Sequence, residues 1–108
     1  MMTNVLVTGG AGFIGSNLCF KLIESGVKVT CVDDLSSGHV SLLSDIKNKI
    51  EFVKSDFASD QILDRVLSGE FKCVYHLAAI PRVSYSVEEP YETTNCNVLK
   101  TVKLLEAC

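Results

Sequence analysis

Short apolar runs alternate with helical patterns along this chain. The runs are nearly continuous in apolar residues, which is typical of strands buried on both faces of a parallel sheet. Strands are therefore predicted over residues 4–8, 27–33, 50–54 and 72–78.

The segment after the first predicted strand has the spacing of a helix. Ile14, Leu18 and Leu22 recur every four residues, which places them on one face of the helix. Gly26 then ends the pattern, because glycine readily takes the positive φ of a helix C-terminus. This first helix is the most clearly marked in the sequence.

The later helices have weaker signals. A loop is predicted over residues 35–41 and a short helix over residues 42–46. Ser59 can cap a further helix that Gly69 ends. After Pro81 we expect a polar loop, followed by a helix that begins between Pro90 and Asn97. The apolar positions of that last helix are Val98, Val102, Leu105 and Cys108.

Strands that alternate with helices indicate parallel pairing through right-handed crossovers. We therefore predict an α/β fold of the Rossmann type, a doubly wound parallel sheet of four strands in the order 3-2-1-4, in one domain over residues 1–108. The last helix reaches Cys108 without a stop signal, so we expect a truncated chain that lacks the second half of the fold. Its fourth strand would form an exposed edge through which the fragment self-associates.

Composition narrows the class of protein. The 108 residues are 47% hydrophobic and carry a net charge of −3, which argues against a disordered chain and against a nucleic-acid partner. No apolar run approaches the ~20 residues of a membrane span, and no signal peptide is visible, so a cytoplasmic protein without membrane association is expected. Four of the five cysteines lie in apolar patterns without zinc-site spacing, so buried reduced thiols are expected.

The candidate chemistry lies in TGGAGFIG at residues 8–15. This segment fits both G-x-G-x-x-G and T-G-x-x-G-x-x-G, and it stands between a strand and a helix, as a dinucleotide site requires. Gly12 would let the main chain touch a pyrophosphate, and Gly15 would let the helix pack closely on the first strand. Amides at the helix start would then hold the anion. Because Ser16 follows Gly15, the phosphate loop of nucleotide hydrolases is excluded.

An acidic residue ends the second predicted strand. Asp33 lies 18 residues after Gly15, close to the ~20-residue spacing at which a carboxylate binds the adenosine ribose of a dinucleotide. A 2′-phosphate beside it would be repelled, since two like charges ~4 Å apart cost ~4 kcal/mol near a protein surface. Asp34 adds to that repulsion, and no Lys or Arg lies between Asp33 and His39. The sequence therefore predicts NAD in preference to NADP.

Other polar residues carry weaker signals. Asp56 ends the third strand, where it could meet the adenine amino group or serve as a polar turn residue. His76 is interpreted as a core or edge histidine and His39 as a loop histidine, and neither has a Cys or Glu at ligand spacing, so no metal is expected. Arg82 could meet a substrate phosphate, although a surface arginine is the simpler interpretation. The two glutamates at 88–89 are typical of a solvated turn.

Several motifs together resemble the extended short-chain dehydrogenase/reductase family. Within it, the resemblance is strongest to NAD-dependent nucleotide-sugar epimerases and dehydratases, UDP-glucose 4-epimerases above all. It extends over essentially the whole chain but only the N-terminal third of such an enzyme. The motifs are VTGGAGFIGSNL at residues 7–18, DDLSSG at 33–38, DF at 56–57, HLAA at 76–79, SVEEP at 86–90 and NV at 97–98.

The resemblance implies NAD as cofactor and assigns residues to it. The pyrophosphate would be lined by Gly9, Gly12, Phe13, Ile14 and Gly15, and the adenosine ribose would lie near Asp33, Asp34, Ser36, Ser37 and Gly38. The adenine would be flanked by Asp56 and Phe57, and the inner half of the cofactor by Leu77, Ala78 and Ala79. Asn97 would anchor its helix near the cofactor. Ser84 is the candidate contact for the sugar of the substrate.

The chain also departs from the family. Lys100 stands where the family often has Gly, and Pro81 stands where some epimerases have a Lys that contacts the nicotinamide ribose, so the sugar is left open. Family catalysis needs a Tyr-x-x-x-Lys pair, in which the tyrosine acts as general base. The residues four after Tyr75, Tyr85 and Tyr91 are Ala79, Glu89 and Asn95. No catalytic residue is therefore assigned.

These observations predict the NAD-binding N-terminal segment of a 4-epimerase of the UDP-glucose/UDP-galactose type. The full-length enzyme would be a homodimer that acts on a nucleotide sugar, and the fragment itself would be inactive. Two alternatives stay open. One is another reaction of the same family, such as a nucleotide-sugar 4,6-dehydratase or decarboxylase. The other is a free-standing module that senses NAD without chemistry, which a natural stop codon after Cys108 would favour.

Overall fold

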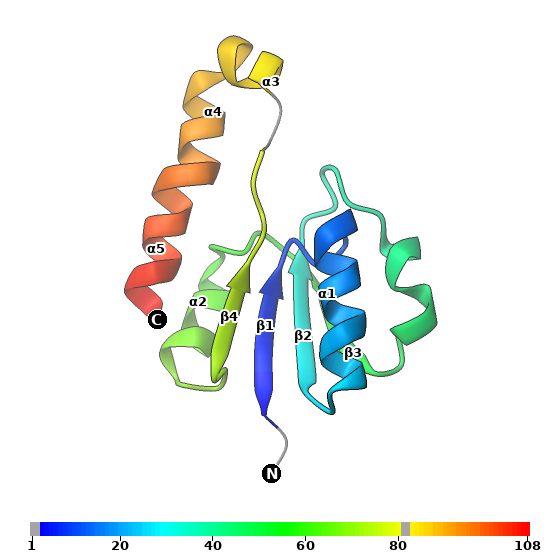
Figure 1. Ribbon diagram of the computed structural model, residues 1–108. Coiled ribbons are helices and arrows are strands. Elements are labelled where there is room, and N and C mark those ends of the chain that lie inside the picture. The colour runs from blue at the N-terminus through cyan, green and yellow to red at the C-terminus, as the bar shows by residue number, and fades with distance from the viewer. Residues whose placement is uncertain (1–2, 81–82) are drawn as a thin grey trace.

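The computed structural model describes residues 3–80 and 83–108. It contains a four-stranded parallel sheet in the order β3-β2-β1-β4 (Figure 1). The strands are β1 (Asn4–Thr8), β2 (Lys28–Asp33), β3 (Ile50–Lys54) and β4 (Cys73–His76). The Rossmann-type fold and the strand order predicted from the sequence are confirmed.

Helices cover both faces of this sheet. The helical elements of the described residues are α1 (Phe13–Glu24), the 3₁₀ helix η1 (Val40–Ile46), α2 (Asp60–Leu67), α3 (Val83–Glu88), α4 (Pro90–Thr94), the π-helical turn η2 (Asn95–Leu99) and α5 (Lys100–Ala107). In Figure 1, α3 and α4 rise beyond the carboxyl ends of the strands, and α5 descends beside β4. Helices α3 and α4 therefore lie above the carboxyl edge of the sheet.

Alternation along the central strands divides the core into two layers. Val5 and Val7 of β1 pack with Cys19 of α1 and with η1 on one face. Leu6 between them packs on the other face with α2 and with Leu104 of α5. Because successive side chains of a strand point to opposite faces, the continuous apolar runs serve both layers.

The predicted helix ends are confirmed at three positions. Gly26 and Gly69 follow α1 and α2 with φ of +81° and +80°, a conformation that glycine adopts without steric cost. The Ser59 side chain accepts a hydrogen bond from the amide of Ile62 and so caps α2. These local signals need no tertiary context, which is why the sequence locates them well.

Other expectations need correction. The segment after residue 82 is not a polar loop, because it forms α3. The apolar stripe of the last helix points outward: Val98, Val102 and Leu105 are exposed, and Leu104 is the residue buried against the sheet. The assignments made for Pro81 and Arg82 lie outside the described residues.

The cysteines are only partly as expected. All five are free thiols, but only Cys19 and Cys31 are buried. The hydrogen bond with Cys19 and burial raise the pKa of the Cys31 thiol. Cys73 and Cys108 are exposed because they stand at the start of the edge strand and at the end of α5.

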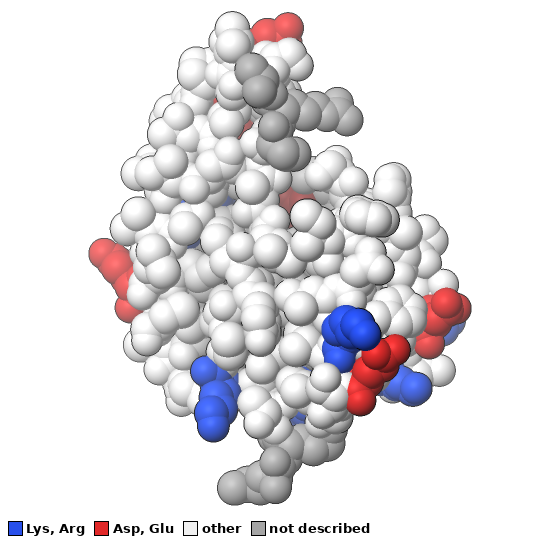
Figure 2. Space-filling view, viewed as in Figure 1, with Lys and Arg blue, Asp and Glu red and all other residues white. Residues whose placement is uncertain are grey.

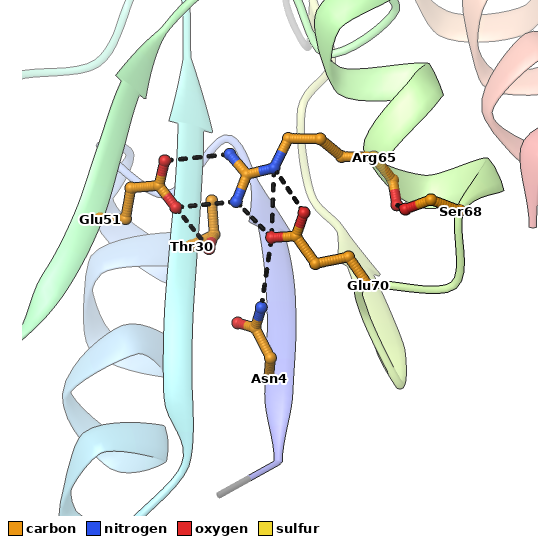
Figure 3. Close-up of polar contacts among 6 residues, drawn as sticks. All are labelled: Asn4, Thr30, Glu51, Arg65, Ser68 and Glu70. Carbon is orange, nitrogen blue, oxygen red and sulfur yellow. Dashed lines mark hydrogen bonds and ion pairs between the residues drawn. The ribbon is translucent and has the colours of Figure 1, made fainter.

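A polar network lies at the opposite edge of the sheet, where the strands begin (Figure 3). Arg65 of α2 donates to Glu51 of β3 at 2.8 and 3.0 Å and also to Glu70, which precedes β4. The buried Thr30 donates to Glu51, and the partly exposed Asn4 donates to Glu70. The hydrogen bonds from Arg65 lower the pKa of both glutamates. The network centred on Arg65 thus links β1, β2 and β3 to α2.

Replacing this arginine tests the network. We expect Arg65→Met to lower the free energy of unfolding by about 1 kcal/mol at pH 7, the scale of a partly exposed ion-pair network. Because both glutamate pKa values are lowered in the folded state, their contribution is full above the unfolded value of 4.5 and is lost as the pH falls through the folded values. Urea unfolding between pH 7 and pH 3 should therefore show the difference from the wild type shrinking in acid.

The control for this prediction is Lys21→Met. It removes an ion pair with Glu24 in which both side chains are largely exposed, so we expect no measurable change. An Arg65→Met loss that stays constant down to pH 3 would contradict the electrostatic account.

Charged side chains on the face shown in Figure 2 form small separate groups, without a broad basic patch among the described residues. None of the helices described is long and apolar enough to span a membrane.

Candidate functional site

A cavity of about 550 Å³ lies at the carboxyl edge of the sheet. It is bounded by the loop between β1 and α1, the ends of β2 and β3, and the segment after β4. Residues of α4 and η2 and the first residue of α5 complete its lining. This edge, beside the first strand, is where open parallel sheets of this type hold ligands. Of the candidate residues, those that border the cavity are Gly9, Gly12, Phe13, Ile14, Gly15, Asp33, Asp34, Ser36, Ser37, Gly38, Asp56, Phe57, Leu77, Ala78 and Ala79.

The glycine loop is tight because its backbone folds onto itself. Gly9 has a φ of +70°, and its carbonyl accepts a hydrogen bond from the Gly12 amide at 3.1 Å. A Cβ on Gly15 would lie 2.2 Å from the Gly9 carbonyl oxygen, so only glycine fits there. No side chain caps α1, and the amides that open its first turn have no partner within the helix. The loop therefore presents free N–H groups at the positive end of the helix dipole.

Asp33 joins the glycine loop to the loop that follows β2. Its carboxylate accepts hydrogen bonds from the Ala11 amide at 3.0 Å and the Leu35 amide at 2.8 Å. Each oxygen retains further acceptor capacity. A Cβ on Gly38 would lie 2.9 Å from Asp33 Oδ2, so this glycine also allows the close approach. The carboxylate is thus fixed at the cavity with lone pairs available to a ligand.

The inner wall of the cavity is held by a directed chain of hydrogen bonds. The buried Thr8 hydroxyl accepts from the amides of Leu77 and Ala78 at 3.0 and 3.2 Å. It therefore donates to His76 Nδ1, 2.6 Å away. Thr101 donates its own proton to the Asn97 carbonyl, so it accepts from His76 Nε2 at 2.9 Å. Burial lowers the pKa of His76, and a neutral ring with its proton on Nε2 satisfies every partner.

Asn97 acts on the wall from outside the cavity. Its side-chain amide donates to the Ile80 carbonyl at 2.9 Å and accepts from the Ile80 amide at 2.7 Å. Ile80 borders the cavity, but Asn97 does not. The structure therefore gives Asn97 a positioning role rather than a direct place at the cavity.

The end of β3 supplies a second carboxylate. Asp56 accepts from the Ala58 amide at 2.9 Å and from Lys100 Nζ at 2.6 Å. Burial alone would raise the pKa of Asp56, but the bonds from Lys100 and Ala58 lower it overall. Phe57 also borders the cavity. It is only 5% exposed, and its ring packs on His76 with the ring centroids 4.5 Å apart.

The cavity differs from the sequence-based candidates in two ways. Ser84 is exposed on α3 and does not border the cavity, so its contact with a sugar stays a prediction. Glu92, Cys96 and Lys100 do border it, and their spacing of four along the last helices was the signal that could have found them. Within residues 3–80 and 83–108, no group of three His, Cys, Asp or Glu side chains could hold a metal.

Comparison with known proteins adds to this geometry. A family model described as GDP-mannose 4,6 dehydratase matches residues 6–108. The chain belongs to this GDP-mannose 4,6 dehydratase family. The resemblance noted in the sequence is thereby confirmed.

Proteins similar to this chain include UDP-glucose 4-epimerases. The enzyme of Mycolicibacterium smegmatis is 46% identical over 94% of this chain, which covers 33% of that relative. The Thermotoga maritima enzyme, solved with UDP-glucose, is 40% identical with a TM-score of 0.87 over 97% of this chain and 33% of its own. The Thermus thermophilus enzyme, solved with NAD, is 36% identical with a TM-score of 0.83 over 98% and 33%. The chain thus spans about a third of these relatives.

Proposed function

We propose that this chain is the NAD-binding segment of a nucleotide-sugar 4-epimerase of the UDP-glucose/UDP-galactose type. The observation that carries the proposal is that one cavity joins the uncapped start of α1, the fixed carboxylate of Asp33 and the carboxylate of Asp56, just after β3. The epimerase relatives, one solved with NAD, support the same assignment.

The residues present fit such a dinucleotide. The backbone contact between Gly9 and Gly15 leaves no room for a Cβ, so the start of α1 stays open to a diphosphate. The amides of Phe13 and Ile14 would hold that diphosphate, Asp33 would accept the ribose hydroxyls, and Asp56 would accept the adenine amino group.

NAD supplies the hydride acceptor when bound. This chain's own residues would bind and orient the dinucleotide, and Leu77, Ala78 and Ala79, which border the cavity, would lie along the inner half of the cofactor. None of the described residues is assigned to proton transfer, so we expect no turnover of a UDP-sugar by the 108-residue chain.

Asp33→Ala tests the assignment of the cofactor. The variant loses acceptors for two ribose hydroxyls, so we expect NAD affinity to fall at least tenfold, on the order of one charged hydrogen bond or more. NADP affinity should fall much less, because removing the carboxylate also removes repulsion of the 2′-phosphate. Calorimetric titration of both dinucleotides measures the two ratios.

Asp45→Ala is the matched control. Asp45 is exposed on η1 and does not border the cavity, so we expect no change in NAD affinity. Equal losses of NAD and NADP in Asp33→Ala would refute the proposed role of this carboxylate.

A dehydratase is the second candidate, since the family model carries that description. The product formed by the longest natural protein that contains this chain discriminates the two: a 4-epimer supports the epimerase, and a 4-keto-6-deoxy sugar supports the dehydratase.

We also propose that the whole enzyme is a homodimer and that this chain by itself associates through its open strand edge. The outward face of the last helix exposes Val98, Val102 and Leu105, and β4 pairs only with β1 in the described sheet. Apolar faces and open strand edges favour association. Light scattering of the chain should therefore show species larger than a monomer, and a purely monomeric profile at high concentration would contradict this expectation.

A further inference from the structure

Lys100 occupies an unusual place at the cavity. It begins α5, and its ammonium lies 2.6 Å from Asp56 Oδ2. Both side chains border the cavity and remain partly open to it, with exposures of 30% and 40%. Lys100 is the one basic side chain among the described residues that bound the cavity. The resemblance gave no role to this position, because the family often has Gly there.

The pair presents a donor beside an acceptor. Asp56 Oδ1 accepts from the Ala58 amide, while Oδ2 faces Lys100 and keeps a lone pair free. The ammonium has three N–H donors, of which one is bonded to Asp56. An acceptor and a donor side by side form the pattern with which an Asn or Gln amide binds the amino group and the adjacent ring nitrogen of adenine.

The geometry points to Lys100 as a specificity-determining residue for the adenine of the dinucleotide. We infer that Asp56 accepts from the adenine amino group while Lys100 donates to the ring nitrogen next to it, N7 or N1. The inference rests on the proposed function, since it deepens the same site.

Charge favours this base over a phosphate as the ligand of Lys100. The ammonium is already paired with Asp56, and Asp34 and Glu92 also border the cavity. A phosphate placed there would meet three carboxylates, whereas a neutral purine edge meets no repulsion. The pair therefore selects a neutral partner that offers one donor and one acceptor.

The experiment combines one variant with altered ligands. NAD and its 7-deaza and 1-deaza adenine analogues, each of which lacks one ring nitrogen, are titrated into the wild-type chain and into Lys100→Met. Lys100→Gln retains a donor and tests rescue, and Lys103→Met removes an exposed charge one turn further along α5 as a control. Circular dichroism establishes that each variant folds.

We expect the wild type to lose about tenfold in affinity for one of the two analogues, and Lys100→Met to lose about tenfold for NAD but nothing further for that analogue. Lys100→Gln should recover part of the loss, and Lys103→Met should behave as the wild type. If Lys100→Met weakens NAD and both analogues equally, Lys100 merely positions Asp56 and the inference is overturned. If the wild type binds none of the three ligands, the proposed function fails instead.

Discussion

Gly15→Ala should lower the free energy of unfolding by more than about 3 kcal/mol and abolish NAD binding. The added Cβ would lie 2.2 Å from the Gly9 carbonyl oxygen and 2.8 Å from Gly10 Cα. Both neighbours are backbone atoms, so no side-chain rotation relieves the overlap, and overpacking costs ~1–3 kcal/mol even where side chains can move. The loop must open, which displaces the amides that would hold the diphosphate. Urea unfolding and calorimetric titration measure the two effects.

Gly26→Ala is the control for backbone strain alone. Gly26 has a φ of +81°, and a Cβ there would meet nothing within 4 Å, so we expect a loss of about 1 kcal/mol and unchanged NAD affinity. If Gly15→Ala is no more destabilising than Gly26→Ala, the packed glycine loop described above is wrong.

The same glycine explains why much of the site was visible in the sequence. The requirement for glycine at Gly12 and Gly15 arises from contacts within one short loop, and at Gly9 from a positive φ, so the pattern of residue types records this local geometry directly. Asp33 is similar, because a strand end followed by a turn fixes where its carboxylate lies. The strand order follows equally from the alternation of strands and helices.

What the sequence did not show depends on contacts between distant segments. Lys100 reaches Asp56 across 44 positions, and nothing local in either segment predicts that pair. The outward stripe at Val98, Val102 and Leu105 has the periodicity of a core face, and periodicity alone does not say which partner covers such a face. The helix α3 was missed because six polar and apolar residues without a clear cap resemble a loop.

Thr8→Val should be the most damaging single change in the inner wall. The buried hydroxyl satisfies the Leu77 and Ala78 amides and His76 Nδ1, and valine keeps the shape while removing all three bonds. The Leu77 amide retains the Thr8 carbonyl at 3.2 Å, so two partly buried groups, the Ala78 amide and His76 Nδ1, lose this partner. At about 1–3 kcal/mol for each such group, we expect a loss of about 2–6 kcal/mol.

The effect should extend to ligand binding, because Leu77 and Ala78 border the cavity. Thr8→Ser distinguishes the contribution of the hydroxyl from that of the methyl group. It keeps the three hydrogen bonds, so we expect a loss of only about 1 kcal/mol in the free energy of unfolding for the lost methyl, with NAD affinity near that of the wild type. Urea unfolding and NAD titration of both variants provide the comparison. If Thr8→Val and Thr8→Ser are equally destabilised, packing rather than the directed chain through His76 holds the wall.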